Sequence, residues 1–149
     1  MGRSDKAISK GITSEYLVKS YFSSEGYIVL SPDTHETHYD FVIEKDSVFK
    51  RVQCKTCAIV KYGYVKQDGT GGSNLVRVRN KRGCKGTTYN EGDYDILVGV
   101  WLENKTLFIF DGKDVLGIKK GESITCARED GTELAPNTKA PLPKLVVKL

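Results

Sequence analysis

The chain has 149 residues, a net charge of +4 and a hydrophobic fraction of 39%, which suits a single domain with a buried core. No segment approaches the run of about 20 apolar residues that a membrane span requires, and the N-terminus lacks the apolar stretch of a secretory signal. These features argue against a membrane-bound or exported protein and predict an intracellular, cytoplasmic one.

The first predicted element is a helix from Ile8 to Ser24, for which Thr13 or Ser14 is the expected N-cap. On a helical wheel Glu15 falls inside the apolar sector rather than opposite it. A salt bridge to Lys19, four residues later, is the simplest explanation of this acid. The other explanation is that Glu15 faces a functional site.

Two patterns have the spacing of partial zinc sites. His35 and His38 lie in the loop after a short predicted strand at residues 27–30, but no third ligand accompanies them. Cys54 and Cys57 form a Cys-x-x-Cys pair without a partner pair, and an offset of three places them on opposite faces of a strand. A solvated loop and free thiols in a reducing compartment are therefore expected.

The segment from Tyr39 to Ala58 is predicted to form a β-hairpin around a tight polar turn near Asp46. Gln53 and Lys55, two apart, project from the same strand face. A two-residue or four-residue loop would place Asp40 directly across from Gln53, whereas a three-residue loop would not. An acid, an amide and a lysine on one side of a sheet suit a metal site that acts on phosphodiesters. The alternative is that these residues belong to an ordinary surface strand, in which charged side chains also alternate.

Positive charge is concentrated between residues 61 and 89, where Asp68 is the only acid. Alternation in this segment places Arg77 and Arg79 on one strand face. We predict a basic hairpin that grips a nucleic-acid backbone, although a charged edge that blocks strand pairing is the other interpretation. The basic residues of this segment are the predicted DNA contacts: Lys61, Lys66, Arg77, Arg79, Lys81, Arg82 and Lys85. We expect Arg77 and Arg79 to contact base edges and the others to contact phosphates.

The apolar run from Ile96 to Leu102 predicts a central strand covered on both faces, and Thr106 to Phe110 its hairpin partner. After Gly121 no strand is expected until Lys144, and residues 132–149 are predicted to be an extended tail. Its apolar end is expected to cover the core or to pair with another subunit.

The order of Glu15, Asp40 and Gln53-x-Lys55 resembles the PD-(D/E)XK nuclease superfamily, in particular the homing endonuclease of cyanobacterial group I introns. There a helix glutamate precedes an aspartate and then an acid or glutamine two residues before a lysine. The resemblance implies an α/β (α+β) fold: one domain over residues 1–149, with a restriction-endonuclease-like core of a helix and a mixed sheet, and the basic segment 61–89 as an insertion. Tyr39 stands where the family usually has proline, and Gln53 where it usually has an acid.

The function implied by the resemblance is site-specific cleavage of double-stranded DNA of the intron-homing type. Glu15, Asp40, Gln53 and Lys55 would be catalytic, and Asp40, Gln53 and Glu15 would hold Mg²⁺, for which Mn²⁺ could substitute. Because one chain has one such site, cutting both strands implies a homodimer or homotetramer. The alternatives are an enzyme like the Holliday-junction resolvases, and, because Gln53 carries no charge, a catalytically dead DNA-binding module.

Overall fold

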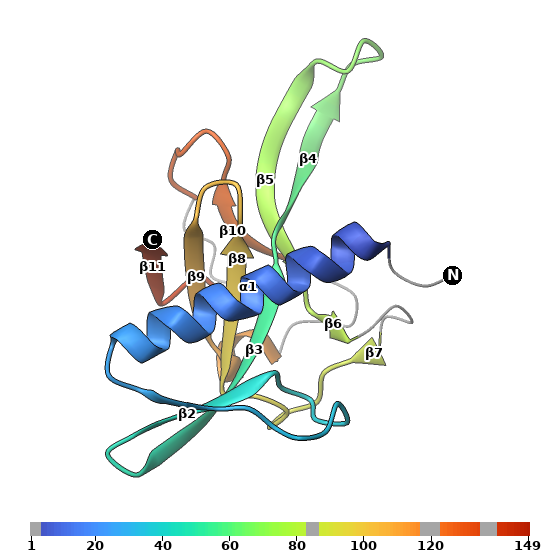
Figure 1. Cartoon of the computed structure of the whole chain (residues 1–149). Helices are drawn as coiled ribbons and strands as arrows, with labels where there is room; N and C mark the ends of the chain where they lie inside the picture. Colours follow the sequence, from blue (N-terminus) through green and yellow to red (C-terminus); the bar gives the residue numbers. More distant parts are fainter. Residues whose placement is uncertain (1–3, 83–86, 117–122, 135–139) are drawn as a thin grey trace.

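The computed structural model describes residues 4–82, 87–116, 123–134 and 140–149. One helix, α1, lies across a six-stranded sheet, and a long hairpin projects beyond the body of the molecule (Figure 1). Within the described residues, no helix is long and apolar enough to cross a bilayer.

Helix α1 spans Asp5–Ser24 and begins earlier than predicted. Its N-cap is Ser4, whose hydroxyl accepts a hydrogen bond from the Ala7 amide, so the expectation of a cap at Thr13 or Ser14 is wrong. The first turns form although Ile8 and Ile12 remain exposed, because the helix is anchored further on by Val18 and Phe22 against the sheet.

The central sheet has the strand order β1-β2-β3-β8-β9-β11, in which β3 and β8 are parallel and all other neighbours antiparallel. The predicted mixed sheet and the apolar strand pair after residue 95 are thereby confirmed. The bounds are β1 Ile28–Leu30, β2 Phe41–Lys45, β3 Val48–Thr56, β8 Ile96–Trp101, β9 Thr106–Asp111 and β11 Leu145–Lys148.

A second, three-stranded sheet has the order β10-β5-β4. Strands β4 (Ala58–Val65) and β5 (Gly71–Arg79) form the projecting hairpin, which we call the arm (Figure 1). A third, two-stranded sheet pairs β6 (Lys81–Arg82) with β7 (Thr87–Thr88). Strand β10 (Ser123–Arg128) was not expected; it pairs with β5 and buries Ile124 and Cys126.

The two faces of the central sheet carry separate cores because successive strand residues point to opposite sides. Val98 and Leu107 face α1, whereas Leu97 and Phe108 face the three-stranded sheet. Gly99 lets the layers approach closely, since a Cβ there would lie 3.1 Å from the Cys126 Sγ. The short helix α2, Gly112–Leu116, follows β9.

The C-terminal strand β11 pairs with β9 of its own chain at the edge of the central sheet, and its Val147 packs against the core on the α1 side. Its apolar side chains stay partly accessible, since Leu145 and Val146 are exposed. Residues 135–139 of the predicted tail lie outside the described residues.

Candidate active site

The β2–β3 hairpin has the two-residue loop that brings Asp40 and Gln53 together. Asp46 and Ser47 both have positive φ, at 52° and 63°, as in the tight turns that match strand twist. The residues paired across β2 and β3 run from Lys45 with Val48, next to the turn, to Phe41 with Val52. Asp40 therefore lies one step beyond the last pair, across from Gln53.

Strand pairing ends at this point and leaves the peptide groups of Cys54 without a neighbouring strand on the β2 side. The backbone amide of Asp40 still donates to the Val52 carbonyl at 2.8 Å. Beyond it, the Asp40 Oδ2 accepts from the Cys54 amide at 2.7 Å, and the Gln53 Nε2 donates to the Cys54 carbonyl at 3.2 Å. Two side chains thus replace the missing strand, and the Gln53 amide oxygen is the atom left to face a cation.

Burial raises the pKa of Asp40 from 3.8 to about 6. The Cys54 amide opposes this rise, the charge of Glu15 adds to it, and the charges of Lys55 and Lys19 lower the pKa again. A half-buried carboxylate next to a second acid is a group that a bound cation would stabilise.

The raised pKa of Asp40 predicts a pH-dependent cost to folding. Below about pH 3 the carboxyl is neutral in both the folded and unfolded states, so the cost is absent. Above about pH 6 it is ionised in both, and a shift from 3.8 to about 6 destabilises the fold by at most about 3 kcal/mol. We therefore expect Asp40→Asn, which keeps an acceptor for Cys54, to stabilise the metal-free protein at pH 8 and to have no effect at about pH 3.

Urea unfolding in EDTA at several pH values measures this difference. Asp46→Asn makes the same chemical change in the exposed hairpin turn and should show no such pH dependence. If Asp40→Asn and the wild type were equally stable at pH 8, the ionised Asp40 carboxylate would not destabilise the fold, and this prediction would be wrong.

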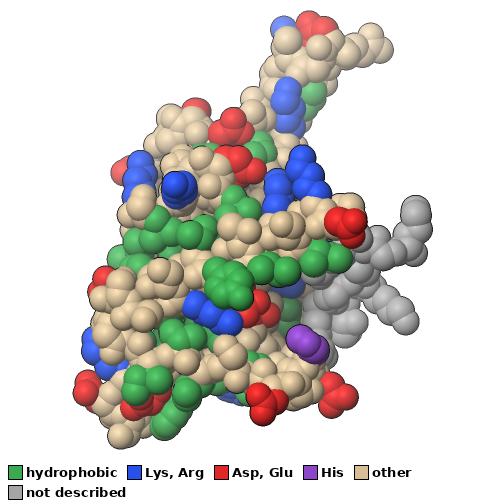
Figure 2. Space-filling model, in the orientation of Figure 1, with side chains coloured by type: hydrophobic (Ala, Val, Ile, Leu, Met, Phe, Trp, Pro, Cys, Tyr) green, Lys and Arg blue, Asp and Glu red, His purple; other side chains and the backbone are tan. Residues whose placement is uncertain are grey.

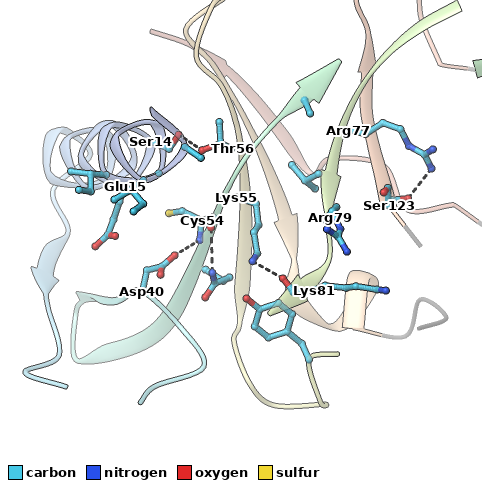
Figure 3. Close-up of a pocket in the computed structure, with 18 of the residues that line it drawn as sticks. Ser14, Glu15, Asp40, Cys54, Lys55, Thr56, Arg77, Arg79, Lys81 and Ser123 are labelled. Atoms are coloured by element: carbon cyan, nitrogen blue, oxygen red, sulfur yellow. Dashed lines mark hydrogen bonds between the residues drawn. The ribbon is translucent and has the colours of Figure 1, made fainter. Parts of the chain in front are cut away.

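Glu15 reaches the site from α1. The preceding residue, Ser14, is buried, and its hydroxyl hydrogen-bonds to the Thr56 hydroxyl at 2.7 Å, one residue after Lys55. Glu15 lines the same groove as Asp40 (Figure 3) and also forms the i,i+4 salt bridge to Lys19 at 3.0 Å. The salt bridge expected from the sequence is therefore present, and the Glu15 side chain also lines the groove.

Lys55 follows Gln53 on the same face of β3, and its ammonium is held at the edge of the groove. Its Nζ donates to the main-chain carbonyl of Lys81 at 2.7 Å and lies 5.3 Å from the centre of the Tyr89 ring. Figure 3 shows Lys55 directed toward Lys81, with Glu15 and Asp40 together on the other side. The charge of Lys55 nevertheless reaches Asp40, whose pKa it lowers.

These side chains line a groove of about 1050 Å³ between α1, the end of β3 and the base of the arm. Lys and Arg side chains gather where the arm joins the body (Figure 2). Arg77 and Arg79 line the groove, as does Lys81, while Lys61 lies further out on β4.

The predicted DNA contacts differ in how they are held. Arg79 is exposed, whereas the Arg77 Nη2 donates to the Ser123 carbonyl at 3.0 Å (Figure 3). The Lys61 Nζ donates to the Gly69 carbonyl across the arm, and Lys66 lies next to the tip. Lys85 and the side chain of Arg82 fall outside what the structure describes.

The donor set fits a hard divalent cation, which prefers carboxylate and amide oxygens. Asp40, Glu15 and the Gln53 amide oxygen are the available ligands. Within the described parts of the chain, no cluster of three His, Cys, Asp or Glu side chains could hold a metal ion, so the zinc patterns of the sequence do not come together. His38 instead pairs with Asp93, 2.8 Å from Nδ1 to Oδ1.

Three features of the groove were missed from the sequence: the Ser14–Thr56 bond, the His38–Asp93 pair and the position of Lys19. The first two join residues 42 and 55 positions apart in the chain, and no local pattern encodes such contacts. Lys19 had a local signal, since it was the expected partner of Glu15, but its nearness to Asp40 depends on the packing of α1.

A helix packed on a mixed sheet, with an acid and a Gln-x-Lys pair where two strands separate, is the arrangement of a PD-(D/E)XK nuclease core. The chain belongs to the PD-(D/E)XK endonuclease family, whose model matches residues 7–133. It is 37% identical over 101 residues to protein 5.3 of Escherichia phage T7, a match covering 68% of this chain and 78% of that protein.

The solved structure of the bacterial homing endonuclease I-Ssp6803I has the same fold, with a TM-score of 0.67. The superposition covers 90% of this chain and 85% of that one at 19% sequence identity. The expected restriction-endonuclease-like fold is thereby confirmed.

Proposed function

We propose that this protein is a Mg²⁺-dependent endonuclease that cuts double-stranded DNA at specific sites. The observation that carries the proposal is the Asp40 carboxylate, half-buried at the end of strand pairing with a pKa raised to about 6. Asp40 lies in one groove with Glu15, Gln53 and Lys55, and the same groove extends to the positively charged residues where the arm joins the body. Membership of the family supports a nuclease.

In this proposal Asp40, the Gln53 amide oxygen and Glu15 hold the ion. The chemistry that Mg²⁺ would supply here is polarisation of the scissile phosphate and a lower pKa for the attacking water. Asp40 provides a full negative charge only above about pH 6, so metal binding should weaken in more acidic solution. Lys55, positioned by the Lys81 carbonyl, stabilises the charge that develops on the phosphate.

The direct test is to incubate the protein with Mg²⁺ and a library of duplexes and to sequence the ends that form. Cleavage at a restricted set of sites, absent in EDTA, is the expected result. Random cutting would remove the site-specific part of the proposal, and selective cutting of four-way junctions would identify a resolvase-like enzyme. DNA binding without any cleavage would identify a DNA-binding module.

Two copies are needed for a double-strand break, because each chain contributes one such groove, so we propose a homodimer or homotetramer that acts on DNA inside the cell. The exposed apolar residues of the C-terminal strand, Leu145 and Val146, are available for such a contact. Sedimentation equilibrium of the full chain, with and without DNA, measures the number of subunits.

We expect Arg79→Gln to weaken DNA binding and to lower the slope of log affinity against log salt, because the variant removes one positive charge that faces the bound DNA. Arg79 is exposed on the groove wall, so its loss removes charge without opening the core. A fluorescence titration in EDTA at several salt concentrations measures the slope.

The matched control is Lys50→Gln, which removes the same charge from an exposed position of β3 outside the groove. Its salt slope should equal that of the wild type. An Arg79 variant with an unchanged affinity and slope would take this residue out of the DNA interface.

A further inference from the structure

Lys19 is a cation built into the acidic side of the groove. Its side chain is 23% exposed, and its Nζ lies 3.0 Å from the Glu15 Oε1 and 3.1 Å from the Ser31 Oγ, to which it donates. The same ammonium lies 5.6 Å from the centre of the Phe41 ring, next to Asp40 in the chain. These contacts fix the charge between α1, the segment after β1 and the start of β2.

The two acids that Lys19 approaches are the carboxylates of the proposed metal site. Ser31, its hydrogen-bond partner, lines a small cavity of about 190 Å³ together with Glu15 and Asp40. The charge of Lys19 also counteracts the rise in the pKa of Asp40 that burial and Glu15 cause. Lys19 thus offsets the repulsion between the two carboxylates.

We propose that Lys19 is the internal counter-ion of the proposed metal site: it offsets one of the two negative charges of Glu15 and Asp40 in the metal-free protein and thereby weakens the binding of a divalent cation. This inference rests on the proposed function, because it concerns the same carboxylates. A positive charge held near a bound cation repels that cation. The Lys19 ammonium therefore stabilises the metal-free site and lowers its affinity for a divalent cation.

The alternative role for Lys19 is to hold Glu15 in place for the metal. The two roles predict opposite changes in metal affinity when the charge of Lys19 is removed. If Lys19 only positions Glu15, its removal weakens metal binding, whereas removal of a competing charge strengthens it.

The variant Lys19→Gln keeps a donor for Ser31 and removes the charge. Calorimetric titration of the DNA-free protein with Mn²⁺ at pH 8 should give a dissociation constant about tenfold lower than that of the wild type. The melting temperature of the same variant in EDTA should fall by about 4 °C, because the carboxylate pair has lost its counter-ion. Neither readout depends on DNA cleavage.

Lys10→Gln is the matched control on the same helix. Lys10 is exposed and pairs with Glu103 at 3.5 Å, outside the groove, so its loss should leave both readouts at their wild-type values. An equal or weaker Mn²⁺ affinity for Lys19→Gln would overturn the counter-ion role while leaving the metal site intact. Wild-type protein whose Mn²⁺ binding is absent, or is unaffected by Asp40→Asn, would instead overturn the metal site and the counter-ion role with it.

Discussion

Replacing Asp40 with asparagine is expected to lower the rate of Mg²⁺-dependent DNA cleavage by about 1,000-fold, which corresponds to about 4 kcal/mol of lost transition-state stabilisation. Asparagine preserves an oxygen acceptor for the Cys54 amide, the contact that holds Asp40 where the strands separate. The variant therefore loses the negative charge without losing the local structure. The measurement is the single-turnover cleavage rate at saturating protein concentration.

The same variant should bind DNA in EDTA at least as tightly as the wild type, because removing a carboxylate from the groove lowers its repulsion of phosphate. Asp46→Asn, in the hairpin turn, controls for the amide substitution and should cleave at the wild-type rate. If Asp40→Asn retains full cleavage while Mg²⁺ is still required, the metal is held elsewhere and the proposed site is wrong.

The hydrogen bond of the Gln53 side chain explains why a glutamine can stand where the family usually has an acid. Its amide nitrogen closes the open edge of β3 by donating to the Cys54 carbonyl. A carboxylate could not make this contact, because an ionised acid only accepts hydrogen bonds. In the proposed metal site, glutamine therefore replaces one negative charge with a fixed side-chain orientation, so metal binding there would depend more on Asp40 and Glu15.

The hairpin that carries Asp40 and Gln53 could be predicted from the sequence because its information is local. Apolar alternation identifies the strands, and the polar pair Asp46-Ser47 suits a short turn. The sequence left the register open among three loop lengths, and the positive φ angles of both turn residues now select one.

The start of α1 and the existence of β10 could not be predicted as well, for different reasons. The expected cap at Thr13 or Ser14 would have left Gly11 outside the helix. Gly11 lies inside it, because packing of Val18 and Phe22 outweighs the roughly 1 kcal/mol that a helical glycine costs. Strand β10 alternates Ile124 and Cys126 with polar residues, which is a weak signal for a short strand. Its pairing with β5 is a contact between distant parts of the chain.

The second large effect is expected for Lys55→Met, which removes the ammonium and keeps an unbranched apolar stem of nearly the same length. We expect the cleavage rate at saturating Mg²⁺ to fall by about 100-fold or more, the usual cost of losing one group that stabilises charge in the transition state. The methionine should also retain contact with the Tyr89 ring, since a thioether packs well against aromatic side chains. The fold should therefore be preserved, and circular dichroism checks this.

The decisive comparison is between the Lys55 and Asp40 variants in metal binding. Lys55 is not among the proposed ligands, and its charge lowers the pKa of Asp40, so Lys55→Met should bind Mn²⁺ as tightly as the wild type or slightly more tightly. Asp40→Asn should lose that binding. Lys50→Met, on the opposite face of the same strand and exposed, removes an equal charge outside the groove and should leave both cleavage and metal binding unchanged. If Lys55→Met cleaves at the wild-type rate, the Lys81 carbonyl holds this lysine for a structural purpose, and the charge on the phosphate must be stabilised by another cation of the groove.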